Sequence, residues 1–173
     1  MAQTARIRDA FERNVKAMAL RPTIGLGTSR ATCRITDGLT CEASDGRFKV
    51  VADMPNAEGG NEQGPTPGFF VRAGMGTCCA ISYAMRAARD GVPIDSIEVE
   101  VEADFDARGA YGLDEAVPGF SEVRYTVTVT SAAPEADILK VIEEGDDFGP
   151  MLDVVRGSVE VKRAVKIVQP VSN

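Results

Sequence analysis

The sequence has no histidine among its 173 residues. Without imidazole, hydrolases with a Ser-His-Asp triad and proteases with a Cys-His pair are excluded, and so are metal sites that depend on histidine ligands. The enzyme classes that remain work with thiols, carboxylates, lysine, arginine or tyrosine. The chain therefore favours thiol chemistry, because a thiol is the strongest nucleophile it retains.

Long apolar runs and clusters of positive charge are also missing. The longest uncharged apolar run, Ala73–Met85, has 13 residues, whereas a membrane-spanning helix needs roughly 20. The N-terminal stretch MAQTARIRDAFERN carries charges where a signal peptide has its apolar segment. Acidic residues outnumber basic ones, 26 against 19, and no segment concentrates the basic ones. We therefore expect a cytoplasmic protein that binds neither membrane nor nucleic acid.

Motifs for metals and cofactors are absent as well. The cysteines at 33, 41, 78 and 79 have no CxxC spacing, which argues against a zinc ribbon and a thioredoxin-type dithiol. Gly25-Leu26-Gly27 and Gly74-Met75-Gly76 do not form dinucleotide-binding fingerprints, because neither lies in a strand-to-helix turn with a third glycine. Asp146-Asp147 either binds a divalent ion or is solvated charge at a helix end. We expect no cofactor and no metal.

Apolar spacing predicts several helices. An amphipathic helix over residues 5–19 ends before Pro22. Thr66 as N-cap and Pro67 at the first position begin a second helix, which runs to about Asp90 and is apolar on every face. This pattern indicates a helix surrounded by protein, whose internal glycines allow close packing against another backbone. Shorter helices are expected from Pro134 to Glu144, with Ile138, Leu139, Val141 and Ile142 buried, and over residues 150–156.

Alternating patterns predict the strands. In a first hairpin, a three-residue loop pairs Ile35 with Leu39 and Cys33 with Cys41, and a two-residue Asp45-Gly46 loop then pairs Ala43 with Phe48 and Cys41 with Val50. Two further alternating strands, 97–105 and 123–129, flank a 106–120 stretch long enough for a binding loop. A last strand is suggested by Val159, Val161, Val165 and Ile167. The fold class is α+β in the order α-βββ-α-ββ-α-α-β.

Cys78 and Cys79, within the second helix, are the main candidates for chemistry. Adjacent helical residues point about 100° apart, so at most one of them faces a given pocket. Either one thiol is a nucleophile, or both pack as small apolar residues. Cys33 and Cys41, opposite each other in the deduced register, form either a cross-strand disulfide or two packed core thiols.

The stretch GPTPGFFVRAGMGTCCAISYAMRAARDGVPIDSIEVEVEADFD resembles the osmotically inducible protein C (OsmC) family and its organic-hydroperoxide-resistance relatives. In that family a polar glycine-rich loop and a proline begin a long buried helix with a cysteine about a dozen residues on. Pro67, Cys78 and Gly91-Val92 fall at the corresponding places, and GFSEVRYTVTVTSAAP at 119–134 also resembles family members. The resemblance covers roughly residues 25–168. It implies antiparallel sheets wrapped around a long buried helix in an intertwined homodimer.

The resemblance implies that Cys78 is the thiolate that attacks a peroxide and becomes a sulfenic acid. Three family residues do not transfer. Gly149 stands where a late Cys-Pro motif holds the resolving cysteine, and Gly68 replaces the carboxylate of the hydroperoxidase branch. The family's arginine aligns near Thr36, with Arg34 as the nearest substitute. Without a guanidinium a buried thiolate is costly, and without a resolving thiol the sulfenic acid needs an external one.

Two hypotheses follow. In the first, the chain is a thiol-dependent peroxide-reducing protein with Cys78 and Arg34 as catalytic residues, Cys79 as a secondary candidate, and an external thiol as reductant. In the second, it is an inactive OsmC-like dimer that binds a small apolar ligand or is structural. A third alternative is a metabolite pocket at the 106–120 loop. We divide the chain into an N-terminal helical extension, 1–24, and one OsmC-like domain, 25–173.

Overall fold

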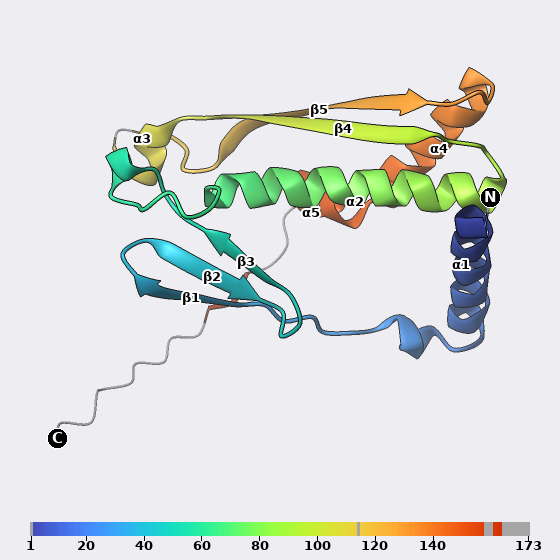
Figure 1. Cartoon of the computed structure of the whole chain (residues 1–173), viewed down its shortest axis with the longest axis horizontal. Coiled ribbons are helices and arrows are strands. Elements are labelled where there is room, and N and C mark those ends of the chain that lie inside the picture. Colours follow the sequence, from blue (N-terminus) through green and yellow to red (C-terminus); the bar gives the residue numbers. More distant parts are fainter. Residues whose placement is uncertain (1, 114, 158–160, 164–173) are drawn as a thin grey trace.

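The computed structural model describes residues 2–113, 115–157 and 161–163 and has an α+β fold. Figure 1 shows a long central helix, α2, with a two-stranded sheet on one side and a three-stranded sheet on the other. The expected last strand falls largely outside the described residues, and 161–163 form no strand. The elements are α1 (Ala2–Leu20), η1 (Pro22–Gly25), β1 (Thr32–Asp37), β2 (Thr40–Ser44), β3 (Lys49–Ala52), η2 (Asn56–Glu58), α2 (Pro67–Asp90), β4 (Ser96–Phe105), α3 (Ala107–Ala110), β5 (Phe120–Thr130), α4 (Glu135–Asp147) and α5 (Pro150–Arg156).

The bounds predicted for the central helix are confirmed. Pro67 is its first residue, and Gly91 ends it in the left-handed conformation at φ 72°, where glycine avoids the Cβ strain of other residues. The expected cap is only partly formed, because Thr66 occupies the N-cap position but its hydroxyl makes no capping hydrogen bond. Proline at the first helical position fixes φ at a helical value. It also has no backbone N–H, which leaves one unpaired donor fewer at the helix start, so the helix begins there without a capping bond from Thr66.

The register predicted for the β1–β2–β3 sheet is wrong by two residues in both hairpins. Cys33 pairs with Ala43 and Ile35 with Cys41, because the first turn is closed by Asp37 and Thr40 after a register shift. Cys41 then pairs with Ala52. A shift of two keeps every side chain on its predicted face.

The second hairpin error has a local chemical cause. The Asp45 carboxylate accepts hydrogen bonds from the backbone N–H groups of Arg47 (2.8 Å) and Phe48 (2.7 Å), and this bonding produces a four-residue loop instead of the expected two-residue turn. The hydrogen bond from the Phe48 N–H, followed by that from the Arg47 N–H, holds the pKa of Asp45 below its usual value. The length of this loop is therefore set by the Asp45 side chain and not by Gly46.

The β4–β5 sheet packs on α2 as alternation predicted. Val99 pairs with Val127 and Val101 with Tyr125, and these residues point to the helix. A Cβ at Gly76 of α2 would lie 3.2 Å from the Val101 side chain and 3.5 Å from the Val99 carbonyl oxygen. The expected close packing of a helix glycine is therefore confirmed at Gly76.

The loop that leads into α2 is fastened by a buried carboxylate. Asp53 accepts hydrogen bonds from the Thr40 hydroxyl (2.7 Å) and from the backbone N–H groups of Met54 (2.8 Å), Gln63 (3.2 Å) and Asn61 (3.4 Å). Burial by itself raises the pKa of Asp53, but these four bonds outweigh it and hold the pKa below the usual value. The glycine-rich loop is thus held against the end of β3 and fixes where α2 begins.

The core lies where α4 and α5 meet α2. Its buried side chains include Met75, Cys79, Tyr83, Val141 and Leu152. Leu139 was expected to be buried but is half exposed on α4. α1 lies across the C-terminal end of α2, where the Phe11 ring is 5.6 Å from the Arg89 guanidinium (Figure 1). In the described part of the chain, no helix combines the length and apolarity needed to cross a bilayer.

Candidate thiol site on the central helix

Cys78 and Cys79 lie on different faces of α2, as the helical spacing requires. Cys79 is only 1% exposed and belongs to the core, whereas Cys78 is half buried. Cys78 shares its face with apolar residues one and two helical turns away in both directions, and several of these are open to solvent. Val71 is 45% exposed and Ile81 60%. We call this set the Cys78 stripe: Val71, Gly74, Cys78, Ile81 and Met85.

The surroundings of Cys79 disfavour a thiolate. Burial raises the pKa of the Cys79 thiol, and the neighbouring Asp146 carboxylate adds to that rise, while a hydrogen bond with Tyr83 opposes it only in part. A raised thiol pKa leaves less of the reactive thiolate at neutral pH. The structure therefore gives the secondary candidate, Cys79, the features of a packing residue.

A polar cluster beside Cys79 was missed by sequence reasoning. The Tyr83 hydroxyl donates to Asp146 Oδ1 at 2.5 Å, and the Tyr125 hydroxyl donates to Oδ2 of the same carboxylate at 2.6 Å. Tyr83 follows Cys79 by four residues, a spacing that could have placed both side chains on one face of the helix. Asp146, weighed above as a metal ligand or solvated charge, is instead held by two tyrosines.

Cys78 and Arg34 are not brought together within the chain. Arg34 is exposed on β1, opposite Glu42 of β2. Successive side chains of a strand point to opposite faces, so Arg34 lies on the other face of the sheet from Cys33 and Ile35. No hydrogen bond or ion pair between Arg34 and another side chain is present in the described residues, and the same holds for Cys78. Within the described residues of one chain, the structure therefore does not support Arg34 as an electrostatic partner of Cys78.

The place of the family's resolving cysteine is tight for a side chain. Gly149 is buried at the start of α5, and a Cβ there would lie 3.0 Å from the Gly145 carbonyl oxygen and 3.4 Å from the Leu152 side chain. Contacts this short force a neighbour to move. Close packing therefore favours glycine at this position.

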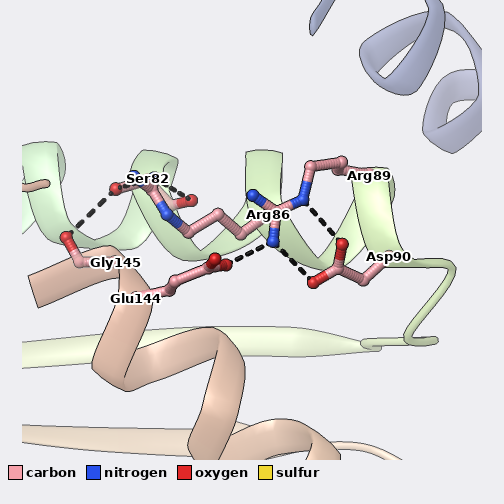
Figure 2. A network of polar contacts seen from close by, with 6 residues as sticks. All are labelled: Ser82, Arg86, Arg89, Asp90, Glu144 and Gly145. Carbon is pink, nitrogen blue, oxygen red and sulfur yellow. Dashed lines mark hydrogen bonds and ion pairs between the residues drawn. The ribbon is translucent and has the colours of Figure 1, made fainter. Parts of the chain in front are cut away.

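An arginine network fastens α2 to α4 (Figure 2). Arg86 Nη1 donates to the Ser82 hydroxyl at 2.7 Å, and that hydroxyl donates to the Gly145 carbonyl oxygen at 3.3 Å. Arg89 binds Asp90 at 2.6 Å and also pairs with Glu144. The guanidinium groups of Arg86 and Arg89 therefore bind Ser82, Asp90 and Glu144. Within the described residues they make no hydrogen bond with a thiol.

The remaining cysteines are free. Cys33 is exposed and Cys41 half buried, and neither is the cross-strand partner of the other. The disulfide alternative is therefore wrong, and so is the assignment of Cys33 to the core of the single chain. The register shift of two residues separates the thiols along the strands.

Comparison with known proteins identifies the fold. An OsmC-like protein from Mycoplasma pneumoniae is 16% identical, with a TM-score of 0.65 over 76% of this chain and 89% of that one. An organic hydroperoxide resistance protein OsmC from Legionella pneumophila is 21% identical (TM-score 0.57; 79% and 95% covered). The organic hydroperoxide resistance protein OhrB of Bacillus subtilis is 24% identical (TM-score 0.51; 79% and 96% covered). No curated protein sequence matches significantly.

The structural likenesses, at these identities, concern the fold. The sequence match is more specific, because the family model described as OsmC-like protein aligns with residues 59–163, which is more than half of the chain and includes all of α2, β4, β5, α4 and α5. This chain therefore belongs to the OsmC-like protein family.

Proposed function

We propose that this protein reduces organic or hydrogen peroxides through Cys78 alone, with a cytoplasmic low-molecular-weight thiol as reductant. The observation that carries the proposal is the contrast between the two thiols of α2: Cys78 lies on an open stripe of the helix, and Cys79 is closed in the core. Two structural neighbours are named hydroperoxide resistance proteins, which supports peroxides as the substrate class.

The proposed reaction needs one peroxide and two reducing thiols. The Cys78 thiolate attacks one peroxide oxygen, the O–O bond breaks, and the departing alkoxide takes a proton to leave as an alcohol, so that Cys78 becomes a sulfenic acid. An external thiol then condenses with the sulfenic acid and releases water. A second thiol attacks this mixed disulfide, restores Cys78 and leaves as part of an oxidised disulfide.

Chemical trapping tests the first step. With one equivalent of tert-butyl hydroperoxide and excess dimedone, we expect the peptide that contains Cys78 to carry nearly one label per chain, as measured by peptide mass spectrometry. Cys33 is the internal control, because it is an exposed thiol on β1 and does not lie on the central helix. Labelling of Cys33 as fast as Cys78, or no labelling of Cys78, would contradict the proposal.

The same proposal includes a homodimer. The Cys78 stripe and the apolar face of the β1–β2–β3 sheet both stay uncovered in one chain: Ile81 is 60% exposed, Ile35 59% and Val50 48%. Exposed apolar surface of this extent is typical of a contact with another protein. In an intertwined dimer the apolar face of one chain's sheet packs along the apolar residues of the other chain's stripe, and Arg34 lies on the far face of that sheet.

Replacing Ile81 with glutamate is expected to turn the dimer into a monomer, because the change places a charge within the apolar contact. Light scattering after size-exclusion chromatography measures the mass. Leu20→Glu is the matched control, since Leu20 is an exposed apolar residue at the end of α1. A monomeric native chain, or an Ile81→Glu variant that stays dimeric at micromolar concentration, would show that the stripe is not the interface.

The alternative function is an inactive dimer that binds a small apolar ligand or is structural. It is favoured by the setting of Cys78, which has no guanidinium partner within the described residues, and by Gly149, which supplies no resolving thiol. The trapping experiment separates the two, because the alternative predicts no more sulfenic acid at Cys78 than at Cys33.

A further inference from the structure

Two thiols lie on the apolar face of the β1–β2–β3 sheet. Cys33 pairs with Ala43, and Cys41 pairs with Ile35, so all four side chains point to the same side of the sheet. Ile35 on this face is 59% exposed, Cys33 is exposed and Cys41 is half buried. Both thiols are free. An apolar face that stays open in one chain therefore carries two thiols that the peroxide chemistry has not used.

In the proposed dimer this face packs along the Cys78 stripe of the other chain. Cys78 is the middle residue of the stripe, because Val71 precedes it by seven residues and Met85 follows it by seven. Seven residues are about two helical turns. A contact that is centred on the stripe is therefore centred on Cys78.

Cys41 is the thiol nearer the centre of the sheet. It lies on β2, the middle strand, and pairs with Ala52 of β3, whereas Cys33 lies on the edge strand β1. The Cα atoms of a disulfide lie within about 7 Å of each other, so the two backbones have to come close. Ala52 and Ala43 beside Cys41 are small and allow a helix to approach the sheet. A contact centred on both surfaces brings Cys41 of one chain to Cys78 of the other.

We propose that Cys41 of the partner subunit captures oxidised Cys78 as an intersubunit disulfide when reducing thiols are scarce. The inference rests on the function and the dimer proposed above. The Cys41 sulfur attacks the sulfur of the Cys78 sulfenic acid, the S–S bond forms, the S–O bond breaks, and the hydroxyl takes the thiol proton and leaves as water. Two external thiols later restore both cysteines by exchange and leave as one oxidised disulfide. One peroxide still consumes two reducing thiols.

The disulfide protects Cys78 from a second oxidation. A sulfenic acid that meets another peroxide becomes a sulfinic acid, which ordinary thiols do not reduce. A transient disulfide of this kind is compatible with a reducing compartment. Excess dimedone or external thiol is expected to reach the sulfenic acid before Cys41 does, so the disulfide accumulates only in their absence.

The experiment treats the reduced full chain with one equivalent of tert-butyl hydroperoxide, without thiol or dimedone, and then blocks free thiols with N-ethylmaleimide. On a non-reducing gel we expect a covalent dimer that Cys41→Ser lowers at least about 10-fold. Cys78→Ser should also remove it, and Cys79→Ser should keep it. Cys33→Ser is the matched control, because it removes the other thiol of the same sheet face. Light scattering checks that Cys41→Ser is still a dimer.

Two results would overturn the proposal. One is a covalent dimer that persists in Cys41→Ser and disappears in Cys33→Ser, which would assign the capture to Cys33. The other is a native chain that forms no covalent dimer although dimedone, added in a parallel sample, labels Cys78. In that case the peroxide chemistry stands and only the capture fails. Absence of the label at Cys78 contradicts the proposed function itself, so the two failures are distinguishable.

Discussion

Tyr83→Ala is expected to lower the free energy of unfolding by about 3–5 kcal/mol, the range found when a large buried aromatic side chain is removed. Tyr83 is fully buried and packs in the core between α2 and α4. A Cβ at Gly145 would come within 2.3 Å of the Tyr83 ring, so the fit between the ring and α4 is close. Urea unfolding followed by circular dichroism measures the change.

Tyr83→Phe separates packing from hydrogen bonding. This variant keeps the ring but removes the donor to Asp146 Oδ1, and Tyr125 still donates to Oδ2. We therefore expect a smaller loss, about 1–3 kcal/mol, from the partly unsatisfied carboxylate. A Tyr83→Ala variant as stable as Tyr83→Phe would contradict the packing account.

The same cluster predicts a loss of stability in alkali. Burial, followed by the hydrogen bond to Asp146, raises the pKa of Tyr125 from 10.0 to about 12, and both causes also raise that of Tyr83. A phenol whose pKa is higher in the folded chain holds its proton more tightly there, so its contribution is full below pH 10 and is lost as the pH rises through the folded value. The free energy of unfolding should therefore fall between pH 10 and 12, and less so in Tyr83→Phe.

Local chemistry predicted much of the fold. Pro67 and Gly91 mark the ends of α2 because proline fixes φ and glycine accepts the left-handed conformation, and neither effect depends on distant residues. The faces of the strands followed from alternation, but their register did not. Asp45 set the length of one loop through its own hydrogen bonds, and several turn lengths were compatible with the same apolar pattern.

The site was less accessible to sequence reasoning. Tyr83 and Asp146 are 63 residues apart, and only the packing of α4 on α2 brings them together. Spacing alone placed Cys78 and Cys79 on different faces, but which face stays open depends on where α4 and α5 pack. Arg34 is only the nearest substitute for the arginine of the family pattern, and within the described residues of one chain it has no hydrogen bond or ion pair with Cys78.

The measurement that tests the central claim most directly is the rate of tert-butyl hydroperoxide consumption with dithiothreitol by the native chain, Cys78→Ser and Cys79→Ser. Because Cys78 is the proposed nucleophile, we predict that Cys78→Ser lowers the rate at least about 100-fold, to that of the reductant alone. Cys79→Ser should keep most of the activity, provided circular dichroism shows that it is folded. Equal rates for Cys78→Ser and the native chain would contradict the assignment of Cys78 as the reactive thiol.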